Sequence, residues 1–153
     1  MSQNGARTLR LEIASAVEML DLVQLVTDHV GHAAGLDDDS VHWFGMAVRE
    51  CVTNAIIHGN GSPSSAVSIE FTTRPAAKPS ELAVCVRDQG PGFDPSRLPD
   101  PLAPENILRT SGRGIYLMRQ FMDDVSIERT STGGTEVRMV KRIRPGESEA
   151  KLR

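Results

Sequence analysis

The stretch from Met46 to Asn60, MAVRECVTNAIIHGN, decides the fold because it places polar side chains at regular intervals in an apolar helical pattern. Glu50, Asn54 and His58 recur every four residues. On a helix with about 100° of rotation per residue, this spacing puts the three side chains on one polar stripe, while the apolar residues fall on faces that can pack inward. A carboxylate and a carboxamide one turn apart can hold a hydrated cation, and the carboxylate can also accept a proton.

The same helix has a second interpretation, in which the stripe is a solvated polar pair and His58 sits at the helix end because a cation there suits the macrodipole. Two downstream glycine motifs favour the functional interpretation. The first is VRDQGPGF, from Val86 to Phe93, an aspartate and spaced glycines at the end of an apolar strand. The second is SGRGIY, from Ser111 to Tyr116, whose two glycines open a helical pattern.

Length and composition indicate an ordinary globular protein. The 153 residues fit one domain, expected at residues 7–143, with disordered ends at residues 1–6 and 145–153. No apolar run suited to a signal or a membrane span follows Met1, so a cytoplasmic protein without a membrane partner is expected. The net charge of −3 argues against nucleic acid as a partner. Cys51 and Cys85 each lie in an apolar pattern and are expected to be small buried residues.

Hydrophobic periodicity predicts the elements in chain order. The expected strands are Thr8–Ile13, Ala66–Arg74, Glu81–Arg87, Asp124–Arg129 and Glu136–Arg142, with the second and third forming a hairpin. The expected helices are Val17–Val30, Asp39–His58 and Gly112–Met122, and the second begins at the acidic run Asp37–Ser40, which suits the helix dipole. Residues 89–110 form the longest irregular stretch and are expected to act as a lid.

Three sequence words, in this order, resemble the nucleotide-binding fold shared by histidine kinases, gyrase-type ATPases and one class of heat-shock chaperones. They are E-x-x-x-N-A-x-x-H-G, D-x-G-P-G and SGRGIYLMRQFMDDVSIE, and the resemblance covers Thr8 to Arg142. The strongest resemblance is to the anti-sigma-factor serine kinase branch. It implies an α/β (α+β) two-layer sandwich, with a mixed, mostly antiparallel sheet covered on one face by three helices and ATP bound between the helices and the lid.

By this resemblance Asp88 reads the adenine amine and selects ATP or ADP, and the Thr135 hydroxyl assists. Each has a plainer interpretation, since an aspartate before Gly90 is typical of a turn and Gly133-Gly134-Thr135 is typical of a hairpin. Asn54 would bind Mg²⁺ through its carbonyl oxygen, and Glu50 would deprotonate the attacking hydroxyl.

The glycine words imply the phosphate end of the site. Gly90 and Gly92 allow the main chain to approach a ligand closely. The run Ser111-Gly112-Arg113-Gly114-Ile115 opens a helix, where unpaired N–H groups suit phosphate oxygens, although its glycines could also be a flexible helix entry. His58, the last residue of the polar stripe, completes the expected nucleotide-binding set.

The function implied is an ATP-dependent serine kinase and anti-sigma factor that phosphorylates a serine of an anti-anti-sigma antagonist of the STAS type. A homodimer is expected. Two alternatives stay open: a non-catalytic ATP-binding module in partner switching, and a stand-alone ATPase domain of the histidine-kinase type. One departure from the family pattern is that no Lys or Arg lies between Arg10 and Arg49, although the first helix is where family members are expected to contact partners.

Overall fold

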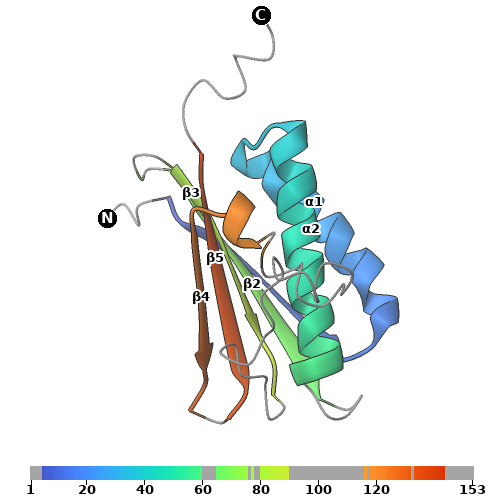
Figure 1. The fold of residues 1–153 in the computed structure, drawn as a ribbon. Helices are drawn as coiled ribbons and strands as arrows, with labels where there is room; N and C mark the ends of the chain where they lie inside the picture. The colour runs from blue at the N-terminus through green and yellow to red at the C-terminus, as the bar shows by residue number, and fades with distance from the viewer. Residues whose placement is uncertain are drawn as a thin grey trace, which may run out of the picture.

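The structure is a computed structural model of the 153-residue chain. It describes residues 5–59, 65–75, 77, 80–89, 116, 118–131 and 133–143. These residues form two layers, a five-stranded sheet and a set of helices that cover one of its faces (Figure 1). No helix among them is both long enough and apolar enough to cross a membrane. The expected domain limits stay a prediction, because only Gly5 and Ala6 of the two expected disordered ends are described.

The secondary structure follows the predicted order. The elements are β1 (Arg7–Ala14), a 3-10 turn η1 (Val17–Met19), α1 (Leu20–Ala34), α2 (Asp38–Asn54), a π-helical turn η2 (Ala55–Gly59), β2 (Ala66–Arg74), β3 (Ser80–Arg87), β4 (Asp124–Arg129) and β5 (Thr135–Ile143). Residues 116 and 118–121 are also helical and are called the pre-β4 helical segment. The five predicted strands agree with the observed ones to within one residue at each end.

The sheet has the strand order β1-β2-β3-β5-β4. Each of its four pairings among the described strands is antiparallel, so the expectation of a mixed sheet is corrected to an antiparallel one. β3 lies between β2 and β5, and Arg87 at its end faces Glu136 near the start of β5. This register brings the residue after β3, Asp88, beside the first residue of β5.

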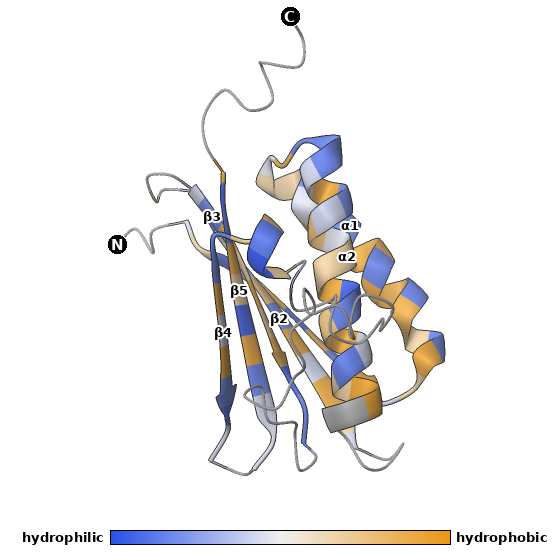
Figure 2. Cartoon of the chain, in the orientation of Figure 1, coloured by the Kyte–Doolittle hydropathy of each residue, from blue (hydrophilic) through white to orange (hydrophobic). Residues whose placement is uncertain are grey.

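The core lies between the helices and one face of the sheet. Alternate residues of β2 and β3 are buried, as expected for strands that face helices on one side only. Figure 2 shows the matching alternation of hydrophilic and hydrophobic residues along β4 and β5. The largest fully buried side chains include Phe44 and Val48 of α2, Ile69 and Phe71 of β2, Leu82 and Val84 of β3, and Met139 of β5. Burial of each such side chain contributes about 1.5–3 kcal/mol to folding.

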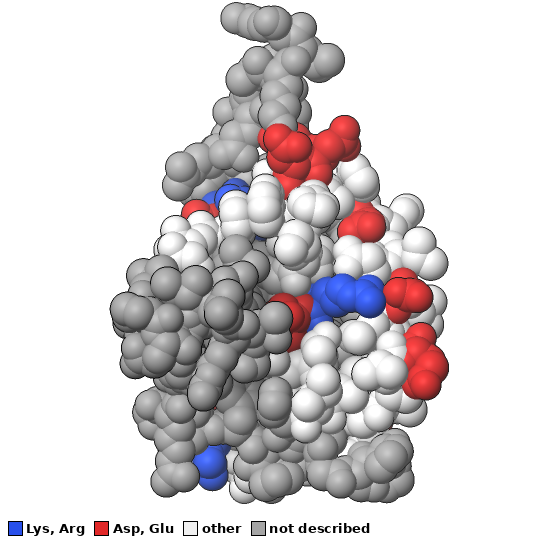
Figure 3. Space-filling view, turned by 45° about the vertical axis from the view of Figure 1, so that its right-hand side comes forward, with Lys and Arg blue, Asp and Glu red and all other residues white. Residues whose placement is uncertain are grey.

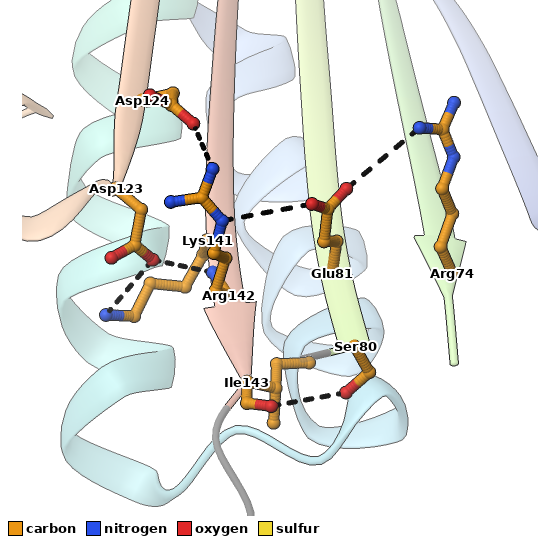
Figure 4. Close-up of polar contacts among 8 residues, drawn as sticks. All are labelled: Arg74, Ser80, Glu81, Asp123, Asp124, Lys141, Arg142 and Ile143. Atoms are coloured by element: carbon orange, nitrogen blue, oxygen red, sulfur yellow. Dashed lines mark hydrogen bonds and ion pairs between the residues drawn. The ribbon is translucent and has the colours of Figure 1, made fainter. Parts of the chain in front are cut away.

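The other face of the sheet is polar and carries ion pairs between strands. The pairs are Arg10–Glu70 at 2.6 Å, Arg87–Glu136 at 2.7 Å, Arg142–Asp124 at 2.7 Å, Arg142–Glu81 at 3.9 Å and Arg74–Glu81 at 4.0 Å. Figure 4 shows the last three, where Glu81 lies between the two arginines. They lie where β3 begins and β5 ends, so they belong to the end of the sheet opposite Asp88.

The two cysteines differ in their surroundings. Cys51 is buried in the core, as predicted, whereas Cys85 is half-buried on the polar face of the sheet. Burial nevertheless raises the pKa of the Cys85 thiol to about 11. The prediction of a buried Cys85 is wrong because helices cover only one face, and Cys85 faces away from them.

α2 begins as the acidic run predicts. The side chain of Asp37 accepts a 2.7 Å hydrogen bond from the backbone N–H of Ser40 and caps the helix. Asp38 and Asp39 lie in the first turn, where the helix dipole favours negative charge. Figure 3 shows acidic side chains gathered at this end of the molecule. α1 ends just before, at Gly35, whose φ of +100° suits the left-handed C-cap of a helix.

The pre-β4 helical segment is attached to both layers. Its Phe121 ring stacks on Trp43 of α2 with a centroid separation of 4.2 Å and an interplanar angle of 5°. Two residues later, a side-chain oxygen of Asp123 accepts a 2.6 Å hydrogen bond from the backbone N–H of Arg142 in β5 (Figure 4). The segment is therefore fixed to α2 by an aromatic contact, and the chain directly after it is fixed to β5 by a hydrogen bond.

Candidate functional site

The last two turns of α2 carry the first half of the candidate site. Glu50 is half-buried and Asn54, one turn later, is buried at 7% exposure although its side chain is polar. The hydrogen-bond pattern of the helix changes at this point. The N–H of Ala55 bonds to the carbonyls of both Cys51 and Val52, and the π-helical turn follows. Such widened turns occur often at functional sites. The predicted helix to His58 is thus interrupted directly after Asn54, and the side chain of His58 lies outside the described part of the chain.

The end of β3 carries the second half. Asp88 is buried at 5% exposure, and Thr135 at 1%. The two residues are joined twice: the N–H of Asp88 donates to the Thr135 carbonyl at 3.0 Å, and the N–H of Thr135 donates to Oδ1 of Asp88 at 3.1 Å. A charge-assisted bond of this kind orients the carboxylate and offsets part of the cost of burying it.

Cys51 connects the two halves. It follows Glu50 in α2, and α2 packs against β3. Burial raises the pKa of its thiol, and the nearby Cys85, Asp88 and Glu50 raise it further. Cys51 is therefore a neutral thiol at physiological pH, within electrostatic reach of both the helix carboxylate and the strand-end carboxylate. α2, which carries Glu50, and β3, which ends just before Asp88, are neighbouring elements of the fold.

The glycine words fall outside the described residues. They comprise Gly90, Gly92, Ser111, Gly112, Arg113, Gly114 and Ile115. Their expected place at the phosphates stays a prediction. Among the described residues, no group of three or more His, Cys, Asp or Glu side chains is arranged to hold a metal ion. A metal bound by Asn54 could take further oxygen ligands from phosphates and water, as is common for Mg²⁺.

Two contacts around Asp88 were not found from the sequence. The side chain of Gln89 accepts a 3.2 Å hydrogen bond from the N–H of Ala66, which joins the chain after β3 to the start of β2. The Arg87 guanidinium donates a 2.7 Å hydrogen bond to Glu136 directly beside the Asp88–Thr135 pair. Both depend on strand register, for which the only sequence signal is the alternation that predicts the strands.

The Arg87–Glu136 pair gives a pH-dependent prediction. The hydrogen bond from Arg87 lowers the pKa of the Glu136 carboxyl below its usual 4.5. The pair therefore contributes stability above about pH 4.5, and that contribution is lost as the pH falls through the lowered native pKa. Glu136→Gln should reduce the free energy of unfolding at pH 7 by no more than about 1 kcal/mol, because both side chains are partly exposed and screened.

Urea unfolding of the wild type and of Glu136→Gln at pH 7 and at pH 3 measures this effect. The difference between the two proteins should shrink at pH 3, and also in 1 M salt at pH 7. A difference that is the same at both pH values would mean that the pair does not stabilise the fold through the charge of Glu136.

Comparison with known proteins decides the family. The model of the histidine kinase-like ATPase domain matches residues 13–141. The chain belongs to the histidine kinase-like ATPase family. Its curated relatives include serine-protein kinases RsbW. The RsbW of Bacillus velezensis is 30% identical over 140 residues, which cover 87% of this chain and 84% of the relative.

Further curated relatives match at similar identities. The serine-protein kinase RsbW of Staphylococcus epidermidis is 28% identical over 89% of this chain and 87% of its own length. That of Bacillus subtilis strain 168 is 28% identical over 91% and 88%. The resemblance to the anti-sigma-factor serine kinase family, drawn from the three sequence words, is confirmed by these matches.

A solved structure supports the fold of this chain. The crystal structure of the RsbU and RsbW domains of Rv1364c from Mycobacterium tuberculosis matches with a TM-score of 0.65 at 15% sequence identity. The match covers 89% of this chain but only 32% of that one. At this identity the similarity shows the α+β architecture alone, and it confirms the predicted α+β class. The expected lid at residues 89–110 stays a prediction, because it lies outside the described residues except for Gln89.

Proposed function

We propose that this chain is an ATP-dependent serine kinase and anti-sigma factor, which binds a sigma factor and phosphorylates a serine of a STAS-type antagonist. The observation that carries the proposal is the buried carboxylate of Asp88, held by the Thr135 N–H at the end of β3. β3 packs against α2, the helix that carries Glu50 and Asn54. Support comes from the family and from relatives named serine-protein kinases.

The buried polar groups fit an adenine nucleotide. A carboxylate that is 5% exposed and fixed by a backbone N–H can accept a hydrogen bond from an exocyclic amine, which adenine has. Nearby apolar side chains, such as Val86 and Val137, provide the low-polarity surroundings in which such a bond discriminates well. Asp88 would therefore bind the base, and the Thr135 hydroxyl would assist.

Asn54 and Glu50 fit the phosphate end. The carboxamide oxygen of Asn54 is a hard donor of the type that Mg²⁺ accepts, and the ion would neutralise charge on the phosphates. Glu50 would take the proton of a serine hydroxyl as its oxygen forms a bond to the γ-phosphorus. The bond from that phosphorus to the bridging oxygen breaks, and ADP leaves. A positioned carboxylate can serve as this base because its oxygen can accept the proton in the transition state.

The metal assignment predicts the effect of Asn54→Ala. This change should weaken ATP binding in the presence of magnesium more than in its absence, since only the first case uses the carboxamide oxygen. Calorimetric titrations with magnesium and with EDTA measure the two affinities. Thr53→Ala is the matched control, because the Thr53 hydroxyl already bonds to the Arg49 carbonyl at 2.7 Å and lies one residue before Asn54.

Equal loss of affinity for Asn54→Ala with magnesium and with EDTA would assign Asn54 to the fold or to the nucleotide rather than to the metal. A magnesium-specific loss in Thr53→Ala as well would point to a general disturbance of the end of α2.

The proposed partners follow from the resemblance to the anti-sigma-factor serine kinase family. They are a sigma factor, a STAS-type antagonist and a second copy of the chain, in the cytoplasm and without nucleic acid or membrane. The described surface at the start of α2 is acidic, which suits partners with basic surfaces (Figure 3).

Phosphate transfer tests the proposal. Proteins retained by the wild type from an extract of its native cell, with and without ATP, provide the sigma factor and the antagonist. The antagonist is then incubated with the wild type and γ-labelled ATP, and the product is mapped. Label on a serine supports the kinase. If the wild type binds ATP and a partner but transfers no phosphate, the kinase proposal is wrong and the chain is a non-catalytic partner-switching module.

A further inference from the structure

The turn between β4 and β5 packs closely against Asp88. Within this turn the N–H of Gly133 donates to the Thr130 carbonyl at 3.0 Å, and the N–H of Thr130 donates to the Gly134 carbonyl at 2.8 Å. The turn is thus closed by its own hydrogen bonds, and Thr135 follows with its two bonds to Asp88.

Gly134 is the point of closest approach. A Cβ atom at this position would lie 2.2 Å from the backbone oxygen of Asp88, 3.0 Å from its carbonyl carbon and 3.3 Å from Oδ1. The first two atoms belong to the main chain at the end of β3, so neither can turn aside as the end of a long side chain could. Any residue other than glycine must therefore push the turn and Asp88 apart.

Gly133 differs although it is the adjacent residue. Its φ is +96°, which favours glycine, but a Cβ atom there would meet no atom within 4 Å. An alanine at Gly133 would strain the turn without touching Asp88. The two neighbouring glycines therefore differ in role. Gly133 allows the backbone conformation of the turn, and Gly134 allows the close contact with Asp88.

We infer that Gly134 is a positioning residue for base selection: its lack of a side chain lets the Thr135 N–H reach the Asp88 carboxylate and hold it in the orientation that accepts the adenine amine. This inference rests on the proposed function, because it takes Asp88 as the reader of the base. Gly134 itself touches no substrate. It acts through Asp88, so changing it should affect recognition of the base and leave recognition of phosphates unchanged.

The experiment compares Gly134→Ala with Gly133→Ala in the full chain. Calorimetry measures affinity for ATP, for GTP and for inorganic tripolyphosphate, which has no base, and circular dichroism checks the fold of each variant. Gly134→Ala should weaken ATP binding roughly tenfold, the effect of losing one well-placed hydrogen bond, and should reduce the preference for ATP over GTP. Its affinity for tripolyphosphate should equal that of the wild type, and Gly133→Ala should bind all three as the wild type does.

The outcomes separate the inference from the proposed function. A wild type that does not bind ATP overturns the proposed function. A wild type that binds ATP, with Gly134→Ala binding ATP equally well, overturns the inference alone. Parallel losses for ATP and tripolyphosphate, or equal losses in the two glycine variants, also overturn it, since they indicate a general structural effect.

A second measurement applies if Gly134→Ala does not fold. Hydrogen exchange of the Thr135 amide is measured in the wild type and in Asp88→Ala, with the other amides of β5 as the internal reference. The inference expects exchange at Thr135 at least roughly tenfold slower in the wild type, because the amide is bonded to the carboxylate. Equal exchange would show that the contact does not hold the carboxylate and would overturn the inference.

Discussion

Replacing Glu50 by glutamine should lower the rate of phosphate transfer to the antagonist by about 10²–10⁴-fold, the usual contribution of a general base. Glutamine keeps the size and much of the hydrogen bonding of glutamate but cannot accept the proton. Affinity for ATP and for the sigma factor should therefore stay at the wild-type level. Transfer from γ-labelled ATP, measured at saturating nucleotide, gives the rate directly.

Glu128→Gln provides the control for the Glu50 experiment. Glu128 is an exposed carboxylate on β4, the edge strand of the sheet, and the same chemical change there should leave the transfer rate unchanged. If Glu50→Gln transfers phosphate as fast as the wild type, another group is the base. Loss of ATP binding in this variant would instead give Glu50 a role in holding the nucleotide.

Asp88→Ala should weaken the binding of ATP and ADP by roughly 1–3 kcal/mol, about 5–150-fold, because a buried hydrogen bond to the base is lost. The fold should persist, since the N–H of Asp88 still donates to the Thr135 carbonyl after the change. Calorimetry on the folded variant measures the effect. Asp124→Ala is a matched control: Asp124 pairs with Arg142 at the opposite end of the sheet (Figure 4). Unchanged ATP affinity in Asp88→Ala would refute the assignment of the adenine pocket.

The strands were predictable because each carries a clear alternation that its burial then follows. β2 and β4 were predicted with the bounds they have, Ala66–Arg74 and Asp124–Arg129. β3 shows the limit of this approach. Its central residues, LAVCV at 82–86, are apolar at both alternate sets of positions, so this part of the strand does not say whether one or two faces are covered. The helices cover one face only, and Cys85 lies on the other.

The end of α2 marks a second limit. The spacing of Glu50, Asn54 and His58 fits a continuous helix, but α2 ends at Asn54 and a π-helical turn follows. Both forms place side chains four residues apart on nearly the same side, so side-chain spacing does not distinguish their hydrogen bonds. Glu50 and Asn54 do lie one turn apart on α2, whereas the change of the backbone after Asn54 was not predicted.

The strand half of the site was predictable as a set of residues but not as a contact. Asp88 and Thr135 could each be singled out from a short glycine-containing word. Their hydrogen bond joins residues 47 positions apart, and it exists because β3 pairs with β5 and not with β4. The role of Gly134 depends on that same pairing, which no local pattern encodes.

The stacked pair of Trp43 and Phe121 provides an intrinsic fluorescence probe. Trp43 is the only tryptophan of the 153 residues, so all indole emission comes from one place. That place is the contact between α2, which carries Glu50 and Asn54, and the pre-β4 helical segment, which follows the glycine word beginning at Ser111. Emission is sensitive to the stacking and hydration of the indole ring. Movement between these two elements can therefore be followed by fluorescence in the unlabelled, unmodified protein.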